Sequence, residues 1–329
     1  MKITVLTAVE GENTPAKEYD VVVSQVARAL RKLGHRVSIM AVYNDVRKLL
    51  AGLSRRKPDL VFNLAEWFGE NVSGDMLVAA LLESQGLRYT GSGPGELYLS
   101  QDKSLTKKLL GYEEILYPRF AVFSQDADFE TGGNLRMPLF VKPLRADASI
   151  GIGRKSLVSD ATSLMRQVAA IHKDVGDAAL AEEYIEGREF YVGVLGNVRA
   201  QALPPVEVDF TGFPEGAPKI LDNRAKWNER SAEYKGTKSV MADIPDELRA
   251  RLQEVSCDAY RALRVRDYGR VDLRVTASGD IYVIEVNASC YLEKSSEFAM
   301  SAAAMGIDFT ALIGRIVDAA MERYDGNGK

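Results

Sequence analysis

The sequence has few of the residues that most often bind metals or act as covalent nucleophiles. Its 329 residues include only two cysteines, Cys257 and Cys290, and two histidines, His35 and His172. Two cysteines make neither a disulfide framework nor a zinc-ligand pattern, so metal chemistry through cysteine or histidine is excluded. No Ser-His-Asp or Cys-His arrangement is visible, which argues against covalent catalysis.

The sequence also lacks long apolar runs and blocks of positive charge. The amino terminus, MKITVLTAVEGENTP, has too short an apolar run for a signal peptide, and no later stretch could span a membrane. Lys plus Arg total 42 against 46 Asp plus Glu, and no basic block is present that could follow a phosphate backbone. We therefore expect a cytoplasmic protein that acts on small molecules, with no nucleic-acid or membrane partner.

The most informative stretch is Tyr268–Asn287, which reads YGRVDLRVTASGDIYVIEVN. Two runs of alternating apolar residues flank Ala277-Ser278-Gly279-Asp280, a pattern that predicts a β-hairpin with a short loop. If those four residues form the loop, the opposed residues are Thr276 with Ile281, Asp272 with Glu285, and Arg270 with Asn287.

Two acidic side chains would therefore face each other on one side of this hairpin. Directly opposed carboxylates, roughly 5 Å apart, destabilise a sheet unless something neutralises them. Carboxylate and amide oxygens suit Mg²⁺, which makes Asp272, Glu285 and Asn287 candidate metal ligands. The alternative is a solvated face with two repelling acids, although the run Tyr-Val-Ile-Glu-Val-Asn is typical of a mostly buried strand.

Residues 1 to 99 alternate between predicted strands and helices. The predicted strands are Lys2–Thr7, Arg36–Val42, Asp59–Asn63 and Leu87–Thr90, and the predicted helices are Tyr19–Gly34, Asp45–Arg56 and Gly74–Gly86. Repeated β-α units imply a parallel sheet covered on both faces, with ligands at the carboxyl ends of its strands. Three segments should border that crevice: Ala8–Thr14, Asn63–Asn71 and Gly91–Gly95.

Two of these segments allow two interpretations each. The glycine-rich stretch Gly91–Gly95 is similar to a nucleotide-binding fingerprint, but it lacks the spacing and a clear following helix, which favours a plain turn. The stretch Asn63–Glu66 leaves a strand end, so Glu66 is a candidate substrate contact. A helix-capping loop is the alternative.

Residues 100 to 187 form a second predicted unit. It comprises a helix from Ser100 to Gly111, the strand Met137–Pro143, the helix Asp160–Lys173 and the strand Ala179–Ile185. The small-residue loop Arg145–Gly153 could cradle phosphate oxygens with its backbone N–H groups, or could be a hairpin turn. The strand Ala179–Ile185 could offer backbone groups to a purine edge, and a carboxylate beyond it could hold ribose hydroxyls.

Residues 188 to 329 form the third predicted unit. Strands Phe190–Leu195 and Val198–Leu203 precede the polar stretch Lys219–Lys235, which is predicted to be a mobile loop. The helix Asp246–Leu263 leads into the hairpin, and the helix Phe309–Arg323 closes the chain.

In combination these motifs resemble the ATP-grasp fold, and within it the D-alanine–D-alanine ligase-like family. The motifs are Lys142 at a strand end, the small-residue loop, Glu182–Ile185 with Glu189, Arg270-x-Asp272 and Glu285-x-Asn287. The resemblance covers essentially the whole chain. It implies an α/β fold with an amino-terminal parallel-sheet domain (1–99) and two α+β ATP-grasp subdomains (100–187 and 188–329) that sandwich ATP.

The resemblance also implies roles for individual residues. The nucleotide would be bound by Lys103, Lys142 and Lys226 at the phosphates, Glu182, Glu183, Tyr184 and Ile185 at adenine, and Glu189 at ribose. Two Mg²⁺ ions, replaceable by Mn²⁺, would be held by Asp272, Glu285 and Asn287. The catalytic candidates are Arg270, which would stabilise an oxyanion, Ser149, whose loop would close over the phosphates, and Lys226. Ser296 would hold a substrate carboxylate, and the family suggests a homodimer.

The reaction that such residues support is carboxylate activation by ATP. A substrate carboxylate attacks the γ-phosphoryl group to give an acylphosphate and ADP, and an amine then attacks the acyl carbon. Positioning and charge neutralisation are sufficient for the first step, without a covalent nucleophile.

Several residues depart from the family pattern around the substrates. Ala148 replaces a serine of the phosphate loop, Trp227 replaces a tyrosine, and Tyr291 stands where a glycine is usual. Lys17 or Glu18 stands near the position of the family's amino-terminal acid. Glu293 and Lys294 could recognise the charged ends of an amino acid, or could lie in a solvated turn.

Three hypotheses follow. The first is an ATP-dependent carboxylate–amine ligase with an altered substrate pocket. The second is an orthodox D-alanine–D-alanine ligase, and the third is a non-catalytic, nucleotide-binding regulatory protein. The intact metal-ligand candidates argue against the third. A dehydrogenase is not favoured, because the first strand-helix turn lacks Gly-x-Gly-x-x-Gly.

Overall fold

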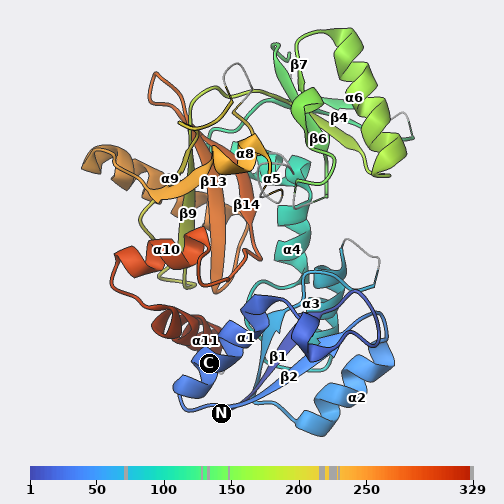
Figure 1. The fold of residues 1–329 in the computed structure, drawn as a ribbon, viewed down its shortest axis with the longest axis vertical. Helices are drawn as coiled ribbons and strands as arrows, with labels where there is room; N and C mark the ends of the chain where they lie inside the picture. The colour runs from blue at the N-terminus through green and yellow to red at the C-terminus, as the bar shows by residue number, and fades with distance from the viewer. Residues whose placement is uncertain are drawn as a thin grey trace.

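The computed structural model describes residues 1–69, 73–126, 129–131, 134–146, 149–214, 219–221, 228 and 230–326. They form three β-sheets with helices packed around them (Figure 1). The amino-terminal sheet is parallel, in the order β2-β1-β3, with β1 (Lys2–Ala8), β2 (Arg36–Val42) and β3 (Leu60–Leu64). Its helices are α1 (Val21–Lys32), α2 (Val46–Arg56) and α3 (Gly74–Ser84), with a short 3-10 turn at Ala16–Glu18. The predicted β-α alternation is confirmed.

Local sequence explains where α1 begins and ends. The Asp20 carboxylate accepts from the Val22 N–H at 2.9 Å and caps the first turn, so the helix starts at Val21 rather than Tyr19. Gly34 follows with φ of 84°, a left-handed conformation that ends helices. The apolar stripe packs on the sheet through buried Val22, Val23, Val26, Ala27, Ala29 and Leu30.

The segment after the amino-terminal sheet differs from the prediction in two places. The predicted strand Leu87–Thr90 reduces to one parallel bridge between Val61 and Tyr89. The predicted turn Gly91–Gly95 instead runs into a helix, α4 (Pro94–Gln101), because Glu96 accepts from the Gly93 N–H at 3.0 Å and proline suits the first helical position. Helix α5 (Lys103–Tyr112) follows after a break at Asp102, so the predicted helix from Ser100 to Gly111 is parts of two helices.

The central sheet has five antiparallel strands in the order β5-β4-β8-β6-β7. They are β4 (Phe120–Phe123), β5 (Phe129–Thr131), β6 (Leu139–Pro143), β7 (Leu157–Val158) and β8 (Ala179–Glu183). Helix α6 (Ala161–Asp174) covers one face, and a 3-10 turn spans Arg154–Ser156. In Figure 1 this unit lies at the end of the molecule opposite the amino-terminal sheet.

The third sheet has the order β12-β11-β9-β13-β14, with β10 paired to β9. Its strands are β9 (Arg188–Leu195), β10 (Gln201–Ala202), β11 (Val206–Asp209), β12 (Lys238–Met241), β13 (Tyr268–Val275) and β14 (Ile281–Asn287). The helices around it are α8 (Ala232–Lys235), α9 (Asp246–Ala262), α10 (Glu297–Ala304) and α11 (Phe309–Gly326).

The amino-terminal and third sheets share their hydrophobic cores. Buried residues of β1, α1 and α11 form one cluster with Tyr268 and Phe298, and α11 lies against α1 (Figure 1). A fully buried carboxylate joins the two units: Asp267 accepts from Arg323 at 2.7 and 2.8 Å and from the Gly91 N–H at 2.8 Å. The central sheet has separate clusters of its own.

Within the described residues, no single helix is long and apolar enough to cross a membrane. The helices Glu297–Ala304 and Phe309–Gly326 pass that test only when taken together, and they bend by 100° at the break between them.

Candidate functional site

The hairpin of β13 and β14 brings the candidate metal ligands onto one face of the third sheet. Asp272 lies opposite Glu285, and Arg270 lies opposite Asn287. These are the pairs that the alternation of residues predicts. Two carboxylates, an amide and a guanidinium therefore meet at this end of the hairpin.

The turn end of the same hairpin differs from the prediction. The predicted pair of Thr276 with Ile281 is wrong, because Ile281 pairs with Val275 and the register shifts between Asp272 and Leu273. The extra residue in this bulge is Ile284, whose carbonyl accepts from Lys107 Nζ at 3.4 Å. The loop is one residue longer than predicted, and the bulge adds one residue to β14. The two changes cancel, so Asp272 with Glu285 and Arg270 with Asn287 are paired as predicted.

Each of the opposed carboxylates has a cation beside it. Arg270 donates from Nε and Nη2 to the two oxygens of Asp272, at 2.7 and 3.0 Å. Lys103 Nζ lies 3.3 Å from Glu285 Oε1, and its side chain is only 6% exposed. Burial alone would lower the pKa of Arg270, but the charge of Asp272 and the bonds to it raise that pKa well above its ordinary value. Arg270 is therefore a permanent positive charge at this site.

The donor set on this face fits a hard divalent cation. Asp272 and Glu285 supply carboxylate oxygens, and Asn287 supplies an amide whose buried Nδ2 has no hydrogen-bond partner among the described residues. An amide whose nitrogen is unpaired can turn its oxygen to a cation. No group of three His, Cys, Asp or Glu side chains suited to a metal occurs in the described part of the chain, so a bound ion here would need the Asn287 oxygen and ligands from substrate or water.

A buried cluster of three charges lies behind this face. Glu182 is 3% exposed and contacts Lys142 Nζ at 2.7 Å and Lys107 Nζ at 3.0 Å. Lys107 is fully buried, and burial lowers its pKa despite the charge of Glu182. Lys142 and Glu182 were expected at the nucleotide, whereas Lys107 was not singled out. Its spacing was a usable signal, because Lys103 and Lys107 are four residues apart on α5 and share one face.

The residues expected to bind adenine follow β8. The Glu183 carboxylate accepts from the Arg136 N–H at 3.0 Å, and the Tyr184 N–H donates to the Pro138 carbonyl at 3.1 Å. The Ile185 N–H has no hydrogen-bond partner among the described residues. It is therefore a backbone donor that a purine edge could use.

Glu189, the residue expected at ribose, lies on β9 and is held by two side chains. Its Oε2 accepts from Arg274 at 2.7 and 3.1 Å, and its Oε1 accepts from the Tyr191 hydroxyl at 3.1 Å. Arg274 was not singled out from the sequence.

The loop that carries Ser149 contacts both the segment at Leu221 and the side chain of Lys103. Ser149 is buried with φ of 60°, and its hydroxyl donates to the Leu221 carbonyl at 3.1 Å. Lys103 Nζ donates to the Ala146 carbonyl of the same loop at 3.2 Å. Arg154 contacts Glu233 of α8 at 2.5 Å. The expected roles of Lys226 and Trp227, and the Ala148 departure, fall on positions outside the described residues.

The segment after β14 is bound to α1. The Glu293 carboxylate accepts from Gln25 at 2.7 Å and from the Ser295 N–H at 2.8 Å, while the Lys294 N–H donates to Gln25 at 2.7 Å. The Lys294 side chain is exposed. Ser296 caps α10 by accepting from the Ala299 N–H at 3.4 Å. These candidate substrate residues lie together at one surface.

The two acidic substrate candidates of the amino-terminal unit are Glu18 and Glu66. Glu18 is exposed in the short 3-10 turn, and it is Asp20, two residues further on, that accepts from the Tyr291 hydroxyl at 2.8 Å. Burial, this hydrogen bond and the charges of Asp20, Glu293 and Glu66 raise the pKa of Tyr291 above its ordinary value. The charges of Glu66 and Glu293 thus both act on the residue that replaces the family's glycine.

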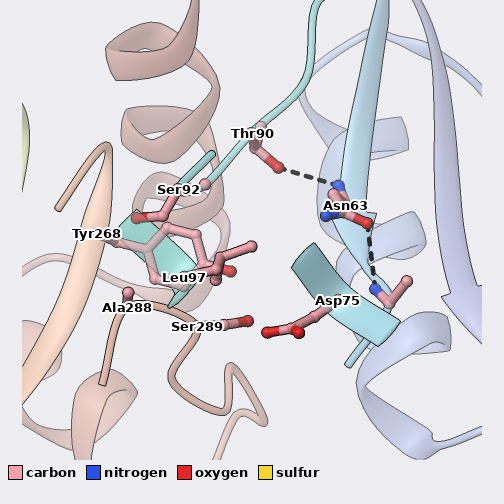
Figure 2. Close-up of a pocket in the computed structure, with 10 residues that line it drawn as sticks. Asn63, Asp75, Thr90, Ser92, Leu97, Tyr268, Ala288 and Ser289 are labelled. Carbon is pink, nitrogen blue, oxygen red and sulfur yellow. Dashed lines mark hydrogen bonds between the residues drawn. The ribbon is translucent and has the colours of Figure 1, made fainter. Parts of the chain in front are cut away.

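A polar pocket lies between the amino-terminal unit and the third sheet. Figure 2 shows Asp75 of α3 and Ser289 of the segment after β14 pointing toward one another across it. On its far side the Asn63 N–H donates to the Thr90 hydroxyl at 3.1 Å. Asn63, Gly91 and Ser92 line the pocket, so two of the three segments expected at the sheet's carboxyl edge meet here.

One further carboxylate at the site was missed by the sequence analysis. Glu297, in the first turn of α10, lies 3.7 Å from Arg270 Nη1 and accepts from the Ser239 hydroxyl at 2.9 Å. Its position directly after Ser296 was the only signal for it.

Comparison with known proteins gives consistent matches. The family model for the D-ala D-ala ligase C-terminus matches residues 110–318. A D-alanine–D-alanine ligase of Nitratidesulfovibrio vulgaris strain DP4 is 34% identical over 299 residues, covering 90% of this chain and 91% of the relative. The uncharacterized protein y4sG of Sinorhizobium fredii is 33% identical over 318 residues, covering 93% of this chain and 89% of the relative.

Solved structures share the fold over the whole length of the chain. The D-alanine–D-alanine ligase of Bacillus anthracis superposes with a TM-score of 0.79 at 23% identity, covering 100% of both chains. The VanG D-Ala:D-Ser ligase of Enterococcus faecalis gives 0.71 at 21% identity, covering 97% of this chain and 100% of its own. The three sheets described above are those of this fold.

Proposed function

Because this chain belongs to the D-alanine–D-alanine ligase family of ATP-grasp enzymes, and is thus an ATP-dependent, ADP-forming carbon–nitrogen ligase, we propose that it joins a carboxylate to an amine through an acylphosphate. We further propose that its substrates are amino-acid-like but are not two D-alanines. The observation that carries the proposed ligase reaction is the hairpin face on which Arg270, Asp272, Glu285 and Asn287 meet beside Lys103.

The residues on this face would divide the reaction between them. Mg²⁺ or Mn²⁺, held by Asp272, Glu285 and Asn287, would neutralise phosphate charge when bound. Lys103 and Lys142 would orient the triphosphate. The substrate carboxylate oxygen attacks the γ-phosphorus, and the bond from that phosphorus to the ADP oxygen breaks.

Arg270 would act in the second step. The amine attacks the acyl carbon, the tetrahedral oxyanion forms and collapses, phosphate leaves, and the nitrogen gives up a proton. A guanidinium that stays charged and is fixed at two points by Asp272 is preorganised to stabilise that oxyanion.

Three contacts support an altered substrate pocket. Tyr291 is bonded to Asp20, Glu293 is bonded to Gln25, and Glu297 places an extra carboxylate beside Arg270. D-alanine has a single ammonium group to pair with a carboxylate, so several acids in this region suit a substrate with a further cationic or hydrogen-bond-donating group.

An orthodox D-alanine–D-alanine ligase is the second candidate. It is favoured by relatives of that name at 30–34% identity over most of the chain. The homodimer suggested by the family also stays a prediction, which light scattering of the purified chain would test.

Hydroxylamine trapping separates these candidates. Hydroxylamine intercepts an acylphosphate as a hydroxamate, so each carboxylate substrate can be tested without its amine partner. We expect hydroxamate and ADP from at least one amino acid in a panel of D- and L-forms, with neither product in Asp272→Asn. Glu247→Gln, an exposed acid in the first turn of α9, is the control that should behave as the unchanged protein.

The outcomes have distinct meanings. Amide product from D-alanine alone would support the orthodox enzyme and contradict an altered pocket. Hydroxamate from another carboxylate, with ADP formed in equal amount, would support the altered pocket. Hydroxamate formation that survives Asp272→Asn would contradict the assigned site.

A further inference from the structure

Arg274 is a buried arginine that none of the roles above uses. It lies on β13 directly opposite Glu189 on β9, and it is 7% exposed. Its Nε and Nη2 donate to Glu189 Oε2, its Nη1 donates to the Ile185 carbonyl at 2.9 Å, and its Nη2 also donates to the Lys219 carbonyl at 2.6 Å. A guanidinium has five N–H donors, and these contacts use four of them.

The backbone brings these partners within reach of a single side chain. The connection from the central to the third sheet passes through Gly187, whose φ is 157°, and a Cβ there would lie 2.0 Å from the Val275 carbonyl. Only glycine therefore lets the connection lie against the end of β13 that carries Arg274. The guanidinium also lies 5.0 Å from the centre of the Tyr184 ring. Arg274 thus joins the expected adenine segment, the expected ribose residue and the beginning of the Lys219–Lys235 stretch.

The hydrogen bonds to Glu189 limit what else that carboxylate can accept. An ionised carboxylate has about four acceptor sites, two on each oxygen. Arg274 occupies both sites on Oε2, and the Tyr191 hydroxyl occupies one on Oε1. One site remains, whereas the ribose of ATP has a 2′ and a 3′ hydroxyl.

We propose that Arg274 is a positioning residue of the nucleotide site that leaves Glu189 able to accept from only one of the two ribose hydroxyls. The inference rests on the proposed role of Glu189 at ribose. The site should then discriminate strongly against one deoxyribose and weakly against the other.

Calorimetric binding of ADP, 2′-deoxy-ADP and 3′-deoxy-ADP in the presence of Mg²⁺ tests this without turnover. In the unchanged protein we expect one analogue to bind about 10- to 100-fold more weakly than ADP, as for a lost hydrogen bond to a charged group. The other analogue should bind within about threefold of ADP, since its missing hydroxyl has no acceptor on Glu189.

Two variants restore acceptor sites in different ways. Tyr191→Phe frees a second site on Oε1 while Arg274 stays in place, so the previously indifferent analogue should also lose affinity. Arg274→Met frees Oε2 and no longer holds the Glu189 carboxylate in place. ADP itself should therefore bind more weakly, and the two deoxy analogues should bind with equal affinity. Because Arg274 is buried, Tyr191→Phe keeps the test available if Arg274→Met does not fold.

Arg188→Met is the matched control. Arg188 is on the same strand as Glu189 and donates to both oxygens of Glu207 at 2.6 Å, away from Glu189. All three nucleotides should bind this variant as they bind the unchanged protein.

Equal weakening of both analogues in the unchanged protein would overturn the inference, and so would an asymmetry that persists in both variants. Absence of any ADP binding would instead contradict the proposed function. The two failures can therefore be told apart.

Discussion

Replacing Glu182 with glutamine removes the negative charge between two buried lysines and keeps the size of the side chain. Lys142 and Lys107 would then lie in the interior, 2.7 and 3.0 Å from a neutral group. Leaving a buried charge without its partner typically costs about 3–5 kcal/mol. Because 1 kcal/mol shifts the melting temperature of a large domain by about 2–4 °C, we expect a decrease of about 6–20 °C.

Calorimetry or urea unfolding followed by tryptophan fluorescence would measure this change. The double variant Lys107→Met with Glu182→Gln should lose less unfolding free energy than the two single variants lose in sum, because it removes both members of the buried pair. Glu183→Gln is the control: this neighbour is half-buried and accepts from the Arg136 N–H, which glutamine can also do. It should change stability by less than about 0.5 kcal/mol.

A loss below about 1 kcal/mol for Glu182→Gln would refute the reasoning, because that is the range of an exposed ion pair. Additive costs in the double variant would refute it as well, since they would mean that Lys107 and Glu182 do not interact.

Three further predictions follow from the same geometry. Burial alone would raise the pKa of Glu182, but Lys107 and Lys142 lower that pKa below its ordinary value. The stabilisation that ionised Glu182 provides is therefore full above the unfolded pKa of about 4.3 and is lost as the pH falls through the lower folded pKa. Because Lys107→Met removes one of the two cations, acid unfolding of this variant should begin at a higher pH. Burial raises the pKa of Cys290 to about 12, so at pH 8 its thiol should react with iodoacetamide only after unfolding, which mass spectrometry would detect. Arg270→Gln should lower kcat for amide formation by about 10²–10³-fold, and a smaller loss would remove it from the oxyanion role.

The sequence was sufficient to predict the hairpin pairs at the candidate site because those pairs depend only on alternation. Asp272 with Glu285 and Arg270 with Asn287 are two such pairs. The pairing at the turn was mispredicted, because the bulge at Ile284 coincides with a contact from Lys107 on a distant helix. A local pattern carries no information about such a contact.

The prediction for the segment that leads into helix α4 was wrong for a different reason. Gly93, Pro94 and Glu96 are a good helix start, but three glycines close together were interpreted as a turn. The hydrogen bond from the Gly93 N–H to Glu96 decided the outcome.

The buried charges were the least predictable part of the site. Lysine and arginine are seldom buried, so nothing in the composition marked Lys107 or Arg274 as interior residues. Both are buried because a carboxylate from another segment lies opposite, Glu182 in one case and Glu189 in the other. Such pairs are visible only after the sheets are assembled.

The shared cores of the amino-terminal and third sheets have a consequence for how the chain unfolds. Residues of β1, α1 and α11 are in one apolar cluster with Tyr268 and Phe298, and Asp267 ties the same two units together, while the central sheet packs on itself. We expect native-state hydrogen exchange to show two cooperative blocks that divide the chain discontinuously. The first and last parts of the sequence should open together, and the middle should open independently and at lower free energy. The chain would therefore fold as a large unit whose two halves are separated in sequence, with a smaller unit inserted between them.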